Sequence, residues 1–166
     1  MQKHILLESP DGYEVYVDLI NSRAGKYISS QPYVATLIKE ILSKKKLPKK
    51  KDIILEHDLG RAIGNCYTVV TSEKDTIFYA LPVKKTTMQR FVRHRQPEQT
   101  THLTILVSHD DEGNFEVTDT WLGNYCPPFP SADLAQEESL SFWDNHAIIA
   151  DMHDIQQRTI TSERPF

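Results

Sequence analysis

Cysteine is scarce in this sequence, and long apolar runs are absent. The two cysteines, Cys66 and Cys126, form no C-x-x-C pair, which argues against a disulfide framework and favours a reducing cytoplasm. No stretch approaches the ~20 apolar residues that a membrane-spanning helix needs. The N-terminal residues also lack the apolar core of a signal peptide. We therefore expect a cytoplasmic protein with no membrane partner.

The common motifs of metal and nucleophile chemistry are missing as well. None of the seven histidines belongs to an H-E-x-x-H motif, and no G-x-S-x-G is present. Gly60 and Gly64 lack the Lys-Ser/Thr pair that completes a phosphate-binding loop. His109 is followed by Asp110 and Asp111, but a turn explains this group better than a cation site. We expect neither a metal nor a cofactor.

Lys and Arg are absent from residues 96–157, a window that holds twelve of the 23 acidic residues. Seventeen of the 19 Lys and Arg residues precede it. Such an asymmetry predicts a basic face and an acidic face on the folded chain, although two sets of merely solvated charges explain it equally well.

Two segments concentrate the positive charge. Residues 84–95 read KKTTMQRFVRHR, in which five of twelve positions are Lys or Arg and none is acidic. Residues 44–51 contain six lysines, which form a solvated linker or a loop that contacts a polyanion. The first segment lies between strand-like runs, and we interpret it as held within one antiparallel sheet.

Strand pairs and two helices are indicated along the chain. Turn residues separate apolar runs at 4–8 and 13–19, at 65–71 and 76–83, and at 101–108 and 115–122, which predicts three hairpins. Residues 31–43 carry an apolar stripe at helical spacing, with Ser30 as the expected cap. Residues 133–145 read as an acidic helix, and 147–150 and 158–161 as short strands.

These elements predict an α+β fold over a single domain, residues 1–166. Its mainly antiparallel sheet would carry two or three helices packed on one side. Residues 1–51 would supply a hairpin, a helix and the lysine-rich loop, and residues 52–166 the sheet core with the acidic helix. Residues 52–64 are ambiguous between a strand and a short helix. A helix there would make His57 and Arg61 neighbours four residues apart.

The remaining residue types suit metal-independent RNA cleavage. That reaction needs a base for the 2′-hydroxyl, an acid for the leaving oxygen and cations for the charge on the phosphate. Imidazole suits proton transfer, and guanidinium suits phosphate. Each histidine is also explained as an ordinary polar residue, and each strand aromatic as core. The catalytic candidates are His57, Arg90, Thr104 and His146. The substrate-binding candidates are Arg61, Tyr79, Lys84, Arg93, Arg95 and Trp121.

Two resemblances bear on this interpretation. From His57 onward the order HDLGRAIG, DTIFYA, RFV, T-x-L-T, D-x-W-x-G, PP and FWDNHA resembles an uncharacterised family of small bacterial proteins. A helix followed by a sheet that bears His, Arg and Thr resembles the barnase–EndoU–colicin–RelE class of endoribonucleases. That likeness implies His57 as the acid-base group, Arg90 on the phosphate and Thr104 as a hydrogen-bonding residue. The acidic C-terminal half departs from the basic surface usual in that class.

Three functions stay open at this point. The leading hypothesis is a metal-independent endoribonuclease of bacterial toxin type, with RNA as substrate and an antitoxin or other protein as partner. The alternative is a non-enzymatic binding module, which holds nucleic acid on its basic face or a basic protein on its acidic face, 110–112 and 137–138. The third is a small-molecule site near Tyr79, Trp121 and His146.

Overall fold

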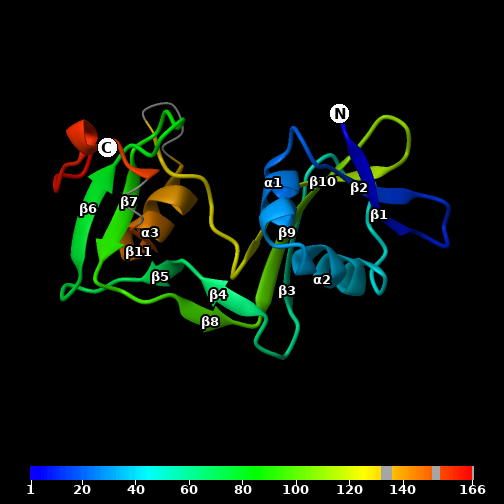
Figure 1. Ribbon diagram of the computed structural model, residues 1–166, viewed down its shortest axis with the longest axis horizontal. Coiled ribbons are helices and arrows are strands. Elements are labelled where there is room, and N and C mark those ends of the chain that lie inside the picture. The colour runs from blue at the N-terminus through cyan, green and yellow to red at the C-terminus, as the bar shows by residue number, and fades with distance from the viewer. Residues whose placement is uncertain (132–135, 151–153, 166) are drawn as a thin grey trace. The chain divides into compact units, whose positions relative to one another are not determined.

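The chain folds into two compact units, each described by itself here. The computed structural model describes residues 1–131, 136–150 and 154–165. The first unit comprises Met1–Ile63 and Thr101–Asn124, and the second comprises Gly64–Thr100 and Tyr125–Phe166 (Figure 1). Helices and mostly antiparallel strands confirm the α+β class. The prediction of one domain over residues 1–166 stays a prediction.

A five-stranded sheet forms the centre of the first unit, with the strand order β1-β2-β10-β9-β3. All neighbours are antiparallel except β2 and β10, which are parallel. The hairpins predicted at 4–8 with 13–19 and at 101–108 with 115–122 are confirmed. Residues 52–64 begin as a strand, which settles that ambiguity. The strands are β1 (Lys3–Glu8), β2 (Glu14–Asp18), β3 (Ile53–Asp58), β9 (His102–His109) and β10 (Phe115–Leu122).

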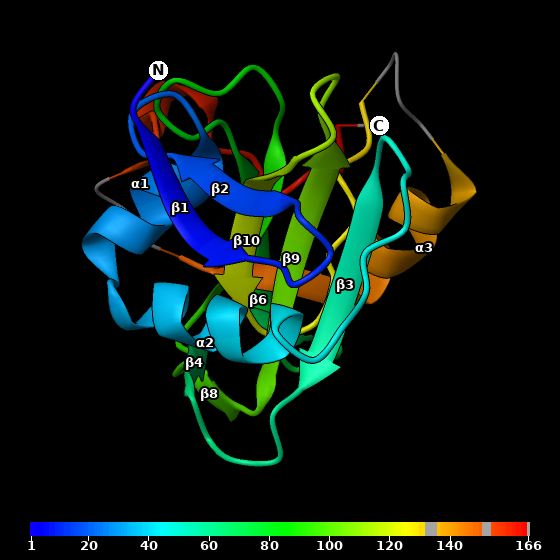
Figure 2. The ribbon, with the colours of Figure 1, turned by 90° about the vertical axis from the view of Figure 1, so that its right-hand side faces the viewer.

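Helices α1 (Arg23–Ser30) and α2 (Tyr33–Leu42) cover one face of this sheet (Figure 2). The apolar stripe of α2 is buried, as its helical spacing predicts. It packs against strand residues such as Leu103, Ile105 and Val107, which alternate inward along β9. The other face of β9 presents His102, Thr104 and further intervening residues.

Helix α1 is not predicted from the sequence, and it changes the role of Ser30. Ser22 caps α1 by accepting a hydrogen bond from the N–H of Gly25 at 2.9 Å. Ser30 ends this helix, with its hydroxyl donating to the carbonyl of Tyr27. The prediction that Ser30 caps the following helix is therefore wrong. α2 begins after Pro32 without a side-chain cap.

The second unit is built on a four-stranded sheet of order β5-β11-β7-β6, and a separate two-stranded pair joins β4 to β8. Helix α3 (Glu137–Asn145) leads directly into β11, which confirms the predicted acidic helix over these residues. Residues 132–135 lie outside the described part. The strands are β4 (Gly64–Cys66), β5 (Thr68–Val70), β6 (Thr76–Ala80), β7 (Gln89–Arg93), β8 (Glu98–Thr100) and β11 (His146–Ile149).

Three predictions from the sequence about strands and their partners are wrong. Residues 65–71 and 76–83 do not form a hairpin, because β5 pairs with β11 and β6 pairs with β7. The predicted strand at 158–161 is a 3₁₀ turn, η2 (Gln157–Thr159), followed by a single bridge between Thr161 and Tyr79. Residues 84–95 are not held between strands of one sheet. Residues 89–93 are themselves a strand, and β9 belongs to the other unit. The partner of β5 lies far away in the sequence, whereas β6 pairs with the next strand of the chain.

Candidate functional site

The residues that the sequence singles out divide between the two units. The first unit holds His57, Arg61, Thr104 and Trp121. The second unit holds Tyr79, Lys84, Arg90, Arg93, Arg95 and His146.

In the second unit, the side chain of Arg90 contacts the backbone of His146. Its Nη1 donates to the carbonyl oxygen of His146 and to Oγ1 of Thr71, each at 2.8 Å. Ile148 of β11 lies opposite Phe91 of β7 in the parallel register. Because side chains alternate along strands, His146 shares the face of Phe91, and Arg90 projects to the other face. Arg90 thus braces the start of β11, while the imidazole of His146 lies on the opposite side of the sheet.

The ring of His146 is held by its own helix end. Nδ1 lies 2.9 Å from the carbonyl oxygen of Phe142 and 2.7 Å from Oδ1 of Asn145. Both partner atoms are acceptors, an arrangement that suits the tautomer with the proton on Nδ1. The ring also stacks on Phe142 with centroids 3.8 Å apart. These contacts fix the junction between α3 and β11.

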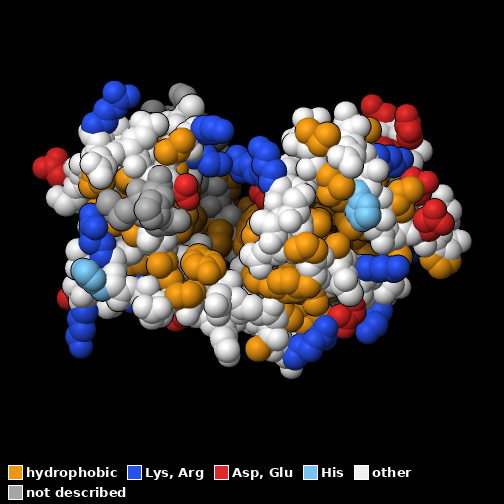
Figure 3. All heavy atoms as spheres, viewed as in Figure 1, with side chains coloured by type: hydrophobic (Ala, Val, Ile, Leu, Met, Phe, Trp, Pro, Cys, Tyr) orange, Lys and Arg blue, Asp and Glu red, His pale blue; other side chains and the backbone are white. Residues whose placement is uncertain are grey.

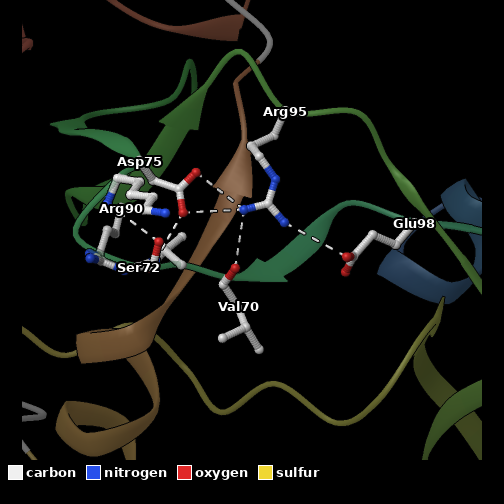
Figure 4. Close-up of polar contacts among 8 residues, drawn as sticks. Val70, Ser72, Asp75, Arg90, Arg95 and Glu98 are labelled. Carbon is white, nitrogen blue, oxygen red and sulfur yellow. Dashed lines mark hydrogen bonds and ion pairs between the residues drawn. The ribbon is translucent and has the colours of Figure 1, made fainter.

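Arg95 is neutralised by acidic partners, as Figure 4 shows. Its Nη1 donates to both carboxylate oxygens of Asp75 at 3.2 Å and to the carbonyl of Val70, and its Nη2 lies 3.7 Å from Glu98. The carboxylate of Asp75 also accepts the N–H of Ser72. This bond first, and then Arg95, holds the pKa of Asp75 below its usual value. Arg95 therefore serves the local structure.

The other candidates in the second unit differ in exposure. The guanidinium of Arg93 lies over the ring of Phe78, 4.3 Å from its centroid. Tyr79 is buried and pairs with Thr161. Lys84 is exposed, with a left-handed backbone at φ 62°. Of the segment 84–95, the arginines are thus largely engaged in structure.

Two candidates of the first unit also have structural partners. Thr104 is fully buried, and its hydroxyl donates to the carbonyl of Gly123 at 2.9 Å. Its own carbonyl accepts from the hydroxyl of Thr120. The indole N–H of Trp121 donates to the carbonyl of Asn124 at 2.9 Å. The hydroxyl of Thr104 thus binds the backbone of the first unit.

The end of β3 brings His57 and Arg61 to one corner of the first unit. His57 lies opposite Leu103, so its side chain is on the sheet face that the helices cover. Beyond it, the carboxylate of Asp58 accepts the N–H of Gly60 at 2.8 Å, and Gly60 adopts φ 72°. Glycine tolerates this left-handed conformation without a steric penalty. The resulting turn directs Arg61 toward helix α2.

Arg61 forms a two-pronged ion pair with Glu40 of α2. Its Nη1 and Nη2 donate to Oε1 and Oε2 at 3.1 and 2.7 Å. These bonds lower the pKa of the Glu40 carboxyl, so it stays ionised. Glu40 in turn raises the pKa of Arg61. An ion pair this exposed contributes little to stability, so the arrangement matters chiefly for what it can bind.

Glu40 lies amid positive charge. Besides Arg61, the charges of Lys44 and His57 reach its carboxyl and help to lower its pKa. Lys44 follows Glu40 by four residues and lies just beyond the end of α2. His57 is half-buried and makes no side-chain hydrogen bond within the described part of the chain. Figure 3 shows basic and acidic side chains side by side over α2 and the loop after β3.

The lysine loop, residues 44–51, extends this corner. Leu47 is buried in the core of the first unit and anchors the loop. Five of its six lysines are exposed, and Lys45 is half-buried. None of the six forms an ion pair with any residue that the structure describes. The loop is therefore a run of mostly exposed lysines without direct ion pairs, which suits polyanion binding.

Acidic residues limit this basic surface at one end. The N–H of His109 donates to the carbonyl of Lys50. The acidic turn 110–112 therefore lies next to the second group of three lysines in the loop, residues 49–51. Figure 3 shows acidic side chains gathered over this turn and over the β1–β2 turn. The first triplet, Lys44 to Lys46, lies instead next to the pair of Arg61 and Glu40.

Sequence reasoning found His57 and Arg61 but missed Glu40 as their neighbour. The four-residue spacing of Glu40 and Lys44 was the only local signal for it. The contact with Arg61 spans 21 residues and needs the turn after β3. No spacing rule along one element could have predicted it.

Comparisons with protein families, curated proteins and solved structures give no match. Among the described residues, no group of three or more His, Cys, Asp or Glu side chains is placed to hold a metal ion. In the same part of the chain, every helix is too short or too polar to cross a membrane.

Proposed function

We propose that this chain is a metal-independent endoribonuclease whose site lies in the first unit, at His57, Arg61 and Lys44. The observation that carries the proposal is the grouping of these three cationic or proton-transferring side chains around Glu40. The lysine loop, next along the chain, offers the surface on which RNA would lie. Arg90, Thr104 and His146 are left out of this site, because their hydrogen bonds serve the two sheets.

In the proposed reaction, His57 takes the proton from a 2′-hydroxyl. The 2′-oxygen then forms a bond to phosphorus, and the bond from phosphorus to the 5′-oxygen breaks. The leaving oxygen takes a proton from water, which yields a cyclic phosphate and a 5′-hydroxyl end. Arg61 and Lys44 would stabilise the negative charge that develops on the phosphate oxygens. The imidazole suits the proton transfer because its ordinary pKa lies near neutrality, at about 6.5.

The test is cleavage of total RNA in EDTA by the wild type, His57→Ala and His4→Ala. Loss of a general base typically slows a reaction about 10²–10⁴-fold, so we expect cleavage by the wild type and the His4 control alone. His4 is exposed on β1 and has no place in the site. Equal cleavage by the His57 variant would remove His57 from the mechanism.

A non-enzymatic nucleic-acid-binding module is the second candidate, and the exposed lysine loop favours it independently. It predicts RNA binding that weakens steeply with salt, without any cleavage. Binding without cleavage by the wild type would therefore select this candidate over the enzyme.

A further inference from the structure

Glu40 is the carboxylate that binds Arg61 in the proposed site, and its position raises the question of what a carboxylate does among phosphate-binding groups. Its two oxygens occupy one edge of the Arg61 guanidinium, at 3.1 and 2.7 Å. The guanidinium has five N–H donors in a rigid fork. Donors therefore remain for a phosphate while Glu40 fixes the orientation of the fork.

We infer that Glu40 sets the charge selectivity of this site. Its negative charge lowers the affinity for terminal phosphomonoesters more than the affinity for internal phosphodiesters. The inference rests on the function proposed above, because it takes Arg61 and Lys44 as the groups that contact phosphate. Together with Glu40 these two residues carry one net positive charge. A phosphodiester carries one negative charge, whereas a phosphomonoester carries about 1.5 to 2 at neutral pH.

The effect follows from the distance between Glu40 and the bound group. A phosphate held by the free donors of Arg61 would lie roughly 6–8 Å from the carboxylate, across one guanidinium. At that distance in water-like surroundings, repulsion by the Glu40 carboxylate weakens the binding of a singly charged ligand about threefold. It weakens the binding of a dianion about eightfold. Repulsion from Glu40 therefore grows with ligand charge, which gives the site a preference for internal positions of an RNA strand.

The experiment measures two small ligands by NMR titration, at pH 8 and an ionic strength of about 0.01 M, where screening is weak. One ligand is a deoxydinucleotide with a single internal phosphodiester, which has no 2′-hydroxyl to react. The other is the matching deoxynucleoside 3′-monophosphate. The proteins are the wild type, Glu40→Gln and Glu56→Gln. Glu56 lies next to His57 on β3 but on the opposite sheet face, opposite Thr104, so it is a matched loss of charge.

Replacement of Glu40 should strengthen monophosphate binding about eightfold and dinucleotide binding about threefold, and replacement of Glu56 should change both much less. Equal gains for the two ligands, or no gain at Glu40, would overturn the inference. Failure of the wild type to bind either ligand would overturn it together with the phosphate site. If the affinities rise as expected but the wild type does not cleave RNA, only the proposed enzymatic activity is contradicted. Glu40 would then be the selectivity residue of an anion-binding site.

Discussion

Both carboxylate oxygens of Glu40 accept hydrogen bonds from Arg61, a residue 21 positions further along the chain. This contact connects the last turn of helix α2 with the loop after the edge strand β3. It places His57 and the beginning of the lysine loop at one corner of the first unit. The arginines of residues 84–95, by contrast, have partners within the second unit that serve its structure.

The lysine loop should supply the salt-dependent part of RNA binding. Changing Lys44, Lys45 and Lys46 to Gln should reduce the slope of log affinity against log salt by up to about 2, because each phosphate contact on a single strand contributes about 0.7. The measurement is fluorescence anisotropy with a labelled RNA over a salt series.

The control changes Lys84 and Lys85 to Gln, two exposed lysines of the second unit. Their loss should leave the slope nearly unchanged. A slope that falls as much in the control as in the loop variant would show that the loop has no special role.

Arg90 should matter for stability and not for cleavage. Arg90→Met leaves the carbonyl of His146 and the hydroxyl of Thr71 without their donor. Loss of such partners typically costs about 1–3 kcal/mol, which urea unfolding followed by circular dichroism can measure. RNA cleavage well below the melting temperature should equal that of the wild type. A folded Arg90 variant that no longer cleaves RNA would return Arg90 to the catalytic site.

Glu116 should give the stability of the first unit a distinctive pH dependence. Burial raises the pKa of this carboxyl, and the charges of Asp18 and Asp110 raise it further. The protonated form therefore favours folding, and this stability is present below the ordinary Glu pKa and lost as pH rises through the raised value. Glu116→Gln should melt at a higher temperature than the wild type at pH 7.

The advantage of Glu116→Gln should vanish below about pH 4, where the wild-type carboxyl is protonated in both states. Glu112→Gln, in the exposed turn, is the control and should show no such gain. If the advantage of Glu116→Gln persists unchanged in acid, the electrostatic explanation is contradicted. Melting curves across a range of about pH 3 to 8 test both statements.

Gly25 should be intolerant of any side chain. A Cβ at this position of α1 would lie 2.7 Å from Cα of Leu19 and still closer to the carbonyl oxygen of Asp18. Because backbone atoms cannot give way cheaply, Gly25→Ala should destabilise the chain by about 1–3 kcal/mol or more. Ser29→Ala, at an exposed position of the same helix, is the control. Urea midpoints that agree between the two variants would refute the close approach of α1 to the end of β2.

The predictions from sequence succeeded where neighbours along the chain decide the structure. Short polar turns join the strands of the β1–β2 and β9–β10 hairpins. The apolar stripe of α2 follows from the spacing of residues within that helix. They failed at β5 and β6, where β11 and β7 are the true partners. They also missed α1, whose eight residues include a glycine that helix propensity disfavours. The close approach of that glycine to β2 shows why tertiary packing outweighs propensity there.

By itself the sequence determined the α+β class, the lysine loop and the presence of His57 and Arg61 within five residues of each other. Only the tertiary structure decided that Arg61 binds the carboxylate of Glu40. It likewise decided that the hydroxyl of Thr104 donates to the carbonyl of Gly123 and that Arg90 donates to the carbonyl of His146. The physical reason is that periodicity and turn chemistry act over a few residues. The partners of a charged or hydroxyl side chain, in contrast, are chosen by strand order and loop direction, which bring together residues far apart in the chain.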